Sequence, residues 1–424
     1  MVLSNTRRLA FIVFSVLLVA LSASAQESNI YVQCPTETVL HPDTDSNATT
    51  REDGIQCGHL VSGDGMVTMA DEVDPDGVGP RGKQLYIFSF AEVPLPGIDG
   101  APTEESGQYP GWVMEQGMMA ANGPAPTIVV DEDDELFLTN TNVGMVIRPD
   151  LFDPHTIHWH GFPQAASIFD GVPDASVSIN MGASFSYYYL AKDAGTYMYH
   201  CHVEATEHMQ MGMLGNLYVR PRQNKLPDLT NLNGFTHETG FTYAYNDNDG
   251  STAYDVEYPI QIGSFDPDFH DASFNVQPLP FAAMKDRYFL LNGRGYPDTV
   301  NAGVLSTDGR PSQPVSSLIT ATAGQRILLR ISNLNVTEFN TLGTNGIPME
   351  VVALDARLLR DDAGNNLYYK TNSVTIGGGQ SVDVILDTTG LAPGSTYFLY
   401  TTNLHELVNN AENFGGMMTE IRIN

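Results

Sequence analysis

Positive charge is scarce in this chain. Among 424 residues there are 20 Lys and Arg against 50 Asp and Glu, which gives a formal net charge of −30. Such a chain repels a phosphate backbone, so nucleic acid is excluded as a natural partner. The excess of acid favours either cationic partners and metal ions, through long-range steering, or simply a surface that keeps the protein in solution.

Long apolar runs are absent beyond the N-terminus, so the sequence predicts no membrane-spanning helix. Residues 1–25 are typical of a signal peptide: two arginines precede the apolar run 9–21, and a small-residue cleavage site ends at Ala25. We therefore expect an exported protein, located in the periplasm or outside the cell. The paired arginines leave two routes open, ordinary secretion and twin-arginine export.

Cysteine is also rare, and the three cysteines separate into a pair and a single residue. Cys34 and Cys57 lie near the N-terminus and are able to pair in an oxidising compartment. Cys201 is left over, between His200 and His202. Side chains alternate between the two faces of a strand, so a strand here would point Cys201 to one face and both imidazoles to the other. One short segment is thus predicted to serve two sites.

Abundant glycine and proline, with short alternating runs rich in Val, Tyr and Thr, favour β-structure. Strands separated by turns at this spacing are typical of β-sandwiches, and the length suits two domains. We expect an irregular extension over 26–83, a first sandwich over 84–221, a linker over 222–226 and a second sandwich over 227–424. Regular structure is expected to begin with a half-buried strand at 84–90.

A metal site is predicted around Cys201. His208 and Met213 follow it on a loop, and His155 lies in a second histidine-rich run. One thiolate, two imidazoles and a weak thioether form the trigonal site of blue-copper electron-transfer proteins. The sequence therefore predicts copper at this site.

The combination of His-x-x-His-x-His-Gly with His-Cys-His-x5-His-x4-Met resembles the multicopper oxidase family. More narrowly, it is similar to the two-domain members that lie between laccases and copper nitrite reductases. The segment Asn122-Gly-Pro-Ala-Pro-Thr-Ile is similar to an early signature of that family. The resemblance covers 84–424 and implies an all-β chain of two cupredoxin-like Greek-key β-sandwich domains.

Carried over by position, the resemblance implies two copper sites. The type 1 copper ligands would be His155, Cys201, His208 and Met213. The His-x4-Met spacing selects Met213 for the weak axial position over its neighbours Met209 and Met211. A second copper site would use His158, His160, His200 and His202.

The second half of the chain repeats the scaffold of the first without its ligands. The family completes a trinuclear copper cluster with histidines from a facing domain. At the corresponding second-half positions the sequence predicts Gly343, Asn345, Thr401 and Asn403. Four-electron reduction of oxygen by a complete trinuclear centre is therefore in doubt, and we expect one to two coppers per chain.

The resemblance implies an exported oxidoreductase. It would take electrons at the type 1 copper from a small-molecule or metal-ion donor and pass them through Cys201 to the second site, where oxygen or another acceptor is reduced. No catalytic residue beyond the ligands is expected. The alternative is a non-catalytic electron-transfer or copper-binding protein. Two-domain relatives form three-fold rings, so we expect a homotrimer, with His405 as a candidate ligand from a neighbouring subunit.

The remaining features suggest no site. Four isolated histidines are expected to face solvent: His41, His59, His237 and His270. The segment Asp247-Asn248-Asp249-Gly250 is similar to a calcium loop, but the ligand pattern is incomplete and a β-turn is favoured.

Overall fold

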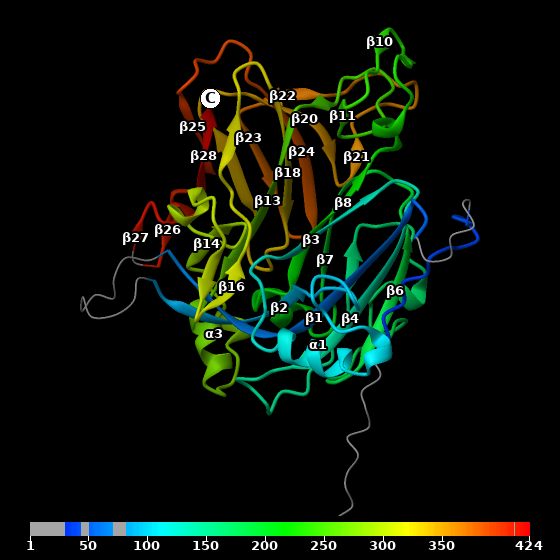
Figure 1. The fold of residues 1–424 in the computed structure, drawn as a ribbon. Coiled ribbons are helices and arrows are strands. Elements are labelled where there is room, and N and C mark those ends of the chain that lie inside the picture. Colours follow the sequence, from blue (N-terminus) through cyan, green and yellow to red (C-terminus); the bar gives the residue numbers. More distant parts are fainter. Residues whose placement is uncertain (1–29, 44–50, 71–81, 411) are drawn as a thin grey trace, which may run out of the picture.

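The structure is a computed structural model that describes residues 30–43, 51–70, 82–410 and 412–424. The predicted signal peptide lies outside the described residues. Each half of the chain forms a β-sandwich, and the two sandwiches pack against each other (Figure 1). No helix in the described part is long and apolar enough to cross a membrane.

In the first half, two four-stranded sheets enclose one apolar core. One sheet has the order β2 (Gln84–Glu92), β1 (Ile55–Thr68), β4 (Glu135–Gly144) and β6 (Ser184–Leu190). The other has the order β3 (Ala125–Asp131), β8 (Leu214–Arg220), β7 (Gly195–His200) and β5 (His158–His160). Helix α2 (Ala205–Gln210) lies in the connection between β7 and β8.

The second half has the same strand order with additions. One sheet runs β14 (Tyr288–Leu291), β13 (Val256–Phe265), β18 (Arg326–Asn333), β24 (Gln380–Asp387), β20 (Met349–Leu354) and β21 (Arg357–Leu358), and β22 (Tyr369–Thr371) also pairs with β20. The other runs β17 (Ile319–Ala321), β28 (Met418–Ile423), β25 (Thr396–Thr401), β19 (Asn340–Thr344) and β23 (Ser373–Ile376). The predicted repeat is confirmed, since β2-β1-β4-β6 corresponds to β14-β13-β18-β24.

Shorter elements decorate the sandwiches. The longer helices are α1 (Tyr109–Gly117) and α3 (Pro267–Phe274). Two-residue to four-residue strands form hairpins: β9 (Asn231–Leu232) with β10 (Phe235–Thr236), β11 (Thr242–Tyr243) with β12 (Ala253–Tyr254), β15 (Leu305–Thr307) with β16 (Arg310–Gln313), and β26 (Val408–Asn409) with β27 (Glu412–Asn413). The 3-10 helices are η1 (Glu104–Ser106), η2 (Ser167–Phe169), η3 (Arg222–Lys225), η4 (Phe281–Ala283), η5 (Asp298–Val300) and η6 (Leu404–Leu407).

The expectation of irregular structure over 26–83 is wrong for its second part. β1 occupies 55–68 and lies inside the first sheet, antiparallel to β2 and parallel to β4. The first sandwich therefore begins with β1 rather than at residue 84. The Cys34–Cys57 disulfide is present and fastens the segment 30–43 to this strand.

The expectation of a half-buried strand at 84–90 is also wrong, because β2 is buried on both faces. Tyr86, Phe88 and Phe90 point into the first core. Leu85 and Ile87 pack instead against second-half residues in a shared apolar cluster. β2 thus forms part of the contact between the sandwiches.

Three of the four histidines expected to face solvent are buried: His59, His237 and His270. The ring partners of His59 and His270 come from distant segments, and His237 Nδ1 lies 2.9 Å from the nearby Tyr243 hydroxyl. The ring nitrogens of His59 lie 2.7 Å from the Tyr109 hydroxyl and 2.8 Å from the Thr141 hydroxyl. The loop at Asp247 is a turn as predicted, since its carboxylate accepts the N–H groups of Asp249, Gly250 and Thr252.

Candidate metal centre

Two neighbouring strands bring the histidine-rich runs of the sequence side by side. β5 and β7 are antiparallel, with His158 opposite His200 and His160 opposite Met198. Cys201 directly follows β7, and its N–H donates to the Met213 carbonyl at 3.2 Å. The alternation of side chains places Cys201 in the apolar core and His200 against a cavity on the other face.

Inside the first sandwich, the donor groups of His155, Cys201 and His208 meet. Their ligand atoms lie within 4.8 Å of one another, and all three side chains are buried. The Nδ1–Sγ distance is 3.2 Å for His208 and 3.9 Å for His155, so both rings turn the same nitrogen to sulfur. Within the described part of the chain, the Nε2 atoms of both rings have no hydrogen-bond partner. A thiol with two imidazoles turned toward it is a donor set that fits copper.

The surroundings of the sulfur keep water out. Burial raises the pKa of the Cys201 thiol to about 11, so the metal-free chain keeps its proton. The Thr156 N–H donates to the sulfur at 3.4 Å, an interaction that supports a thiolate. Copper binding at this position has to displace the thiol proton.

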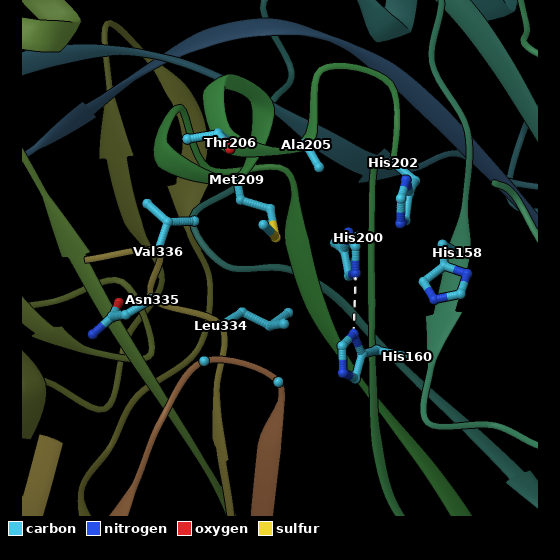
Figure 2. A pocket seen from close by; sticks show the side chains of 12 residues that line it. His158, His160, His200, His202, Ala205, Thr206, Met209, Leu334, Asn335 and Val336 are labelled. Carbon is cyan, nitrogen blue, oxygen red and sulfur yellow. Dashed lines mark hydrogen bonds between the residues drawn. The ribbon is translucent and has the colours of Figure 1, made fainter. Parts of the chain in front are cut away.

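The three methionines of the loop lie in different places. Met213 and Met211 are buried in the first core. Met209 lines the cavity on the other face (Figure 2). Met213 is the one tied to predicted ligands through its main chain, since its N–H donates to the His208 carbonyl at 2.8 Å.

On the opposite face, four histidines line a cavity of about 400 Å³ (Figure 2). Ligand nitrogens of His158, His160 and His200 lie within 4.8 Å of one another. The His202 ring lies 5.1 Å from that of His158 between centroids. We call these four residues, His158, His160, His200 and His202, the outer histidine cluster.

The ring nitrogens that face away from the cluster are held by named partners. His158 Nδ1 lies 2.6 Å from the Asp170 carbonyl, and His200 Nδ1 lies 2.8 Å from the Cys201 carbonyl. A carbonyl only accepts, so both rings donate through Nδ1 and leave Nε2 for a metal. His160 differs, because its Nδ1 lies 3.3 Å from His200 Nε2.

The outer histidine cluster is suited to binding metal at neutral pH. Burial lowers the pKa of His158, His160 and His200, in the last case to about 3. Neutral imidazoles keep a lone pair available for a metal ion.

The second half contributes a wall to this cavity but no ligand. The lining residues from that half are Leu334, Asn335, Val336, Gly378 and Gly379. The second half of the same chain therefore partly covers the four imidazoles. Sequence reasoning missed this wall, although the run Gly377-Gly378-Gly379 was a signal of close backbone approach.

The structure corrects the alignment of the two halves by one residue. Thr401 N–H donates to the Met417 carbonyl, as Cys201 N–H does to Met213, so Thr401 corresponds to Cys201. The residues equivalent to His200 and His202 are therefore Tyr400 and Thr402, not Thr401 and Asn403.

The second-half counterpart of the inner site is filled by other chemistry. Thr401 Oγ1 donates to the buried Glu406 carboxylate at 2.6 Å. His405 is exposed, its ring lies 5.1 Å from that of Phe289, and it does not line the cavity.

Comparison with known proteins gives one consistent family. A family model described as multicopper oxidase matches 105–224, and a second model of the same description matches 274–419. The multicopper oxidase MCE of Talaromyces pinophilus is 36% identical over 115 residues, which is 26% of this chain and 18% of that protein. Laccase-1 of Emericella nidulans is 35% identical over 117 residues, 26% of this chain and 17% of that protein. The matched region thus spans less than a fifth of each relative.

Solved structures show the same fold over most of the chain. The blue copper oxidase from Nitrosomonas europaea is 22% identical, with a TM-score of 0.58 over 87% of this chain and 86% of that one. A copper-containing nitrite reductase from Thermus scotoductus is 16% identical, with a TM-score of 0.51 over 87% of this chain and 62% of that one. The predicted all-β, cupredoxin-like sandwich fold is confirmed.

Proposed function

The chain belongs to the multicopper oxidase family and has copper as its cofactor, and on this premise we propose an exported oxidoreductase with two copper sites. His155, Cys201, His208 and Met213 form the type 1 site, which accepts electrons from a small-molecule or metal-ion donor. The outer histidine cluster forms the second site, which hands them to oxygen or another acceptor. Copper supplies one-electron redox chemistry when bound at these positions.

The inner residues are arranged for electron transfer rather than for binding a substrate directly. Cys201, His155 and His208 are buried, which holds the ligand geometry constant and excludes water. An Asp153 carboxylate oxygen lies 3.9 Å from His208 Nε2, so this edge of the ring lies beside a half-buried acidic residue. A donor at this edge would reach the site through His208.

The observation that carries the proposal is the shared backbone of the two sites. Cys201 faces the inner site while its neighbour His200 faces the outer cluster, so a short covalent path joins them. The hydrogen bond between His200 Nδ1–H and the Cys201 carbonyl, at 2.8 Å, adds a second connection between the same two residues.

The outer cluster suits one copper better than three. Two nitrogens bound to one tetrahedral ion at about 2.0 Å are about 3.3 Å apart, and His160 Nδ1 and His200 Nε2 have this separation, 3.3 Å. The second half offers no further histidine to the cavity. We expect one to two coppers per chain by elemental analysis, whereas four with brisk oxygen uptake would contradict the proposal.

The lack of a second-half histidine along this cavity favours one alternative function. With Gly343, Asn345, Tyr400 and Thr402 at the second-half positions, the chain lacks half of a trinuclear cluster. A non-catalytic electron carrier or copper-binding protein needs only the inner site. Turnover of a phenol or of cuprous ion under air, with oxygen uptake measured alongside, separates the two functions: an oxidoreductase consumes oxygen in proportion to donor oxidised, and a carrier stops after one equivalent.

We further propose a homotrimer. The second half already partly covers the outer cluster, so the surface that a neighbouring subunit would cover lies elsewhere, at exposed apolar residues around His405. Leu404, in η6, is 77% exposed, and Phe414, which directly follows β27, is 65% exposed. A neighbouring subunit that covers them would bring His405 into the interface. Light scattering should give three times the chain mass, and a monomer at working concentration would contradict the trimer.

A further inference from the structure

Gly379 belongs to a three-glycine loop of the second half, between β23 and β24, that touches the outer histidine cluster. Its backbone has φ +86°, a conformation that favours glycine. A Cβ built on Gly379 would lie 2.6 Å from His160 Nε2 and 2.9 Å from His160 Cε1. The far edge of the His160 ring therefore rests directly on the Gly379 backbone.

The loop has no room to retreat from His160. The Gly379 N–H donates to the Asn333 carbonyl at 2.8 Å, and the Gly377 N–H donates to Gln380 Oε1 at 2.9 Å. A Cβ on Gly378 would lie 2.2 Å from the Asn335 carbonyl oxygen, so this backbone is packed closely on both sides. The wall that meets His160 is rigid.

His160 is also held from its opposite edge. Its Nδ1 lies 3.3 Å from His200 Nε2, and the His200 ring is fixed by its own bond to the Cys201 carbonyl. In the neutral, metal-free rings His200 Nε2 has only a lone pair, so the proton between the two rings is on His160 Nδ1. A ring confined between His200 and Gly379 cannot shift along this line.

We infer that Gly379 is a positioning residue for the second copper site: it sets the His160 ring so that Nδ1, rather than Nε2, faces the metal position. This inference rests on the proposed function of the outer cluster. The inferred role of Gly379 means that the second half, which adds no histidine to the cavity, still shapes the copper site of the first half. The rings of His158 and His200 donate through Nδ1 and present Nε2, so His160 is the exception that needs this support.

The test compares copper binding in variants of the full chain. The methyl group added in Gly379→Ala would overlap the His160 ring, so this ring must move. Rotation of the ring takes Nδ1 away from the metal position. We expect the dissociation constant of Cu²⁺ at the outer cluster to rise about tenfold to a hundredfold. The blue absorbance of the inner site should stay unchanged and reports that the chain is folded.

A matched control separates the clash from backbone strain. Gly390 has φ +82° in the same half, and a Cβ there would meet nothing within 4 Å, so Gly390→Ala carries the strain alone. Gly379→Asn carries the clash with less strain, because Asn tolerates positive φ. We expect Gly390→Ala to bind Cu²⁺ like wild type and Gly379→Asn to bind it as weakly as Gly379→Ala.

Two further measurements show whether the effect passes through His160. In a His160→Ala background, Gly379→Ala should cause no further loss of Cu²⁺ affinity. In the metal-free protein, nitrogen-15 NMR should find the His160 proton on Nδ1 in wild type and redistributed in Gly379→Ala. Wild-type affinity in Gly379→Ala, or an equal loss in both backgrounds, would overturn the inference alone. Wild-type protein that binds no copper at the outer cluster would overturn the proposed function as well.

Discussion

Met213 and Met211 are both buried, yet their main chains hold different parts of the molecule. The Met213 carbonyl accepts the Cys201 N–H and its own N–H donates to the His208 carbonyl. The Met211 carbonyl instead accepts the Phe88 N–H of β2 at 3.0 Å. Only Met213 is therefore coupled to two predicted copper ligands, which supports it as the axial ligand.

Substitution of these methionines tests the assignment. Met213→Leu should keep the blue colour and raise the reduction potential, because the weak axial ligand mainly tunes the potential. Met211→Leu, equally buried, should leave the potential close to wild type. Cys201→Ser should remove the colour without unfolding the sandwich, as measured by visible absorption and circular dichroism. A potential that moves with Met211 rather than Met213 would exchange their roles.

Burial of the His59 ring should make the stability of the folded protein depend on pH. Burial lowers its pKa from 6.5 to about 3, so the folded chain keeps the ring neutral where the unfolded chain protonates it. The contribution of the neutral His59 ring to the free energy of unfolding is complete above pH 6.5, and it is lost as the pH falls from 6.5 toward 3.

We expect the free energy of unfolding of wild type to fall by about 1.4 kcal/mol more per pH unit than that of His59→Gln between pH 6 and 4. Urea unfolding at several pH values measures the difference. The other buried histidines contribute equally to both proteins, so parallel curves would show that His59 does not stay neutral in the folded state.

Among the elements, β1 shows why part of the fold could not be predicted. Glycines at 58, 63 and 65 argue against a strand, yet each lies where another side chain packs closely, such as Leu138 against Gly58 and Val143 against Gly63. The partner strand β4 is far away in sequence, so no local pattern reveals the pairing. β5 and β7, in contrast, were predictable because their ligand spacing is local.

The segment 30–43 is anchored to the first sheet at two points. The disulfide joins Cys34 to Cys57 on β1, and His41 Nδ1 lies 2.8 Å from a Glu135 oxygen on β4. The ligand residues are not part of either contact. The segment therefore stabilises the sheet without shaping the copper sites.

Removal of the disulfide should lower stability without changing the inner site. It closes a loop of sequence separation 23, for which chain entropy predicts a loss of about 3 kcal/mol. Denaturant unfolding of the variant with Cys34→Ala and Cys57→Ala measures this loss, and its blue band should match wild type. A changed band would mean that the segment reaches the copper ligands.

At the scale of the whole molecule, a buried charge network joins the two sandwiches. Arg330 on β18 is fully buried and donates to Glu257 at 3.0 Å and to the Thr196 hydroxyl at 3.1 Å. Thr196, at the start of β7, donates to Asp383 on β24 at 2.6 Å. The strand β7, which ends at the proposed copper ligands, is thus fixed to the second half where it begins.

Arg330→Met should therefore destabilise the folded protein by about 3–5 kcal/mol, because it leaves the buried Asp383 carboxylate without its neighbouring cation, while Glu257 keeps Arg220 as a partner. Arg422→Met is the control, since Arg422 pairs with Glu420 at 2.7 Å in a partly exposed ion pair, and it should change stability by about 1 kcal/mol or less. Urea unfolding followed by fluorescence compares them. Equal effects of the two variants would mean that the network contributes no more than a surface pair.

One part of the candidate sites could be predicted from the sequence and another part could not. The difference lies in how far apart in the sequence the contacting residues are. Residues proposed to bind one ion from one strand and its following loop, such as Cys201 and His208, keep a fixed spacing that the sequence reveals. The wall formed by Leu334–Val336 and Gly378–Gly379 depends on how two sandwiches pack, which has no periodic signature in the chain. The one-residue error at Thr401 arose because a longer loop precedes Met417, and only backbone hydrogen bonds fix that register.

The parallel pairing of the first strand in each half also orders events during synthesis. Ile55 pairs with Glu135 and Val256 with Ile327, so neither leading strand finds its parallel neighbour until a long stretch of later chain has emerged. Such non-local contacts make folding slow. In the first half this frame of β1, β2 and β4 precedes His155, Cys201 and Met213 in the order of translation. The first core also includes Cys201, Met213 and Leu217, so this sandwich closes only after the predicted copper ligands have been synthesised, and we expect the copper site to form late in folding.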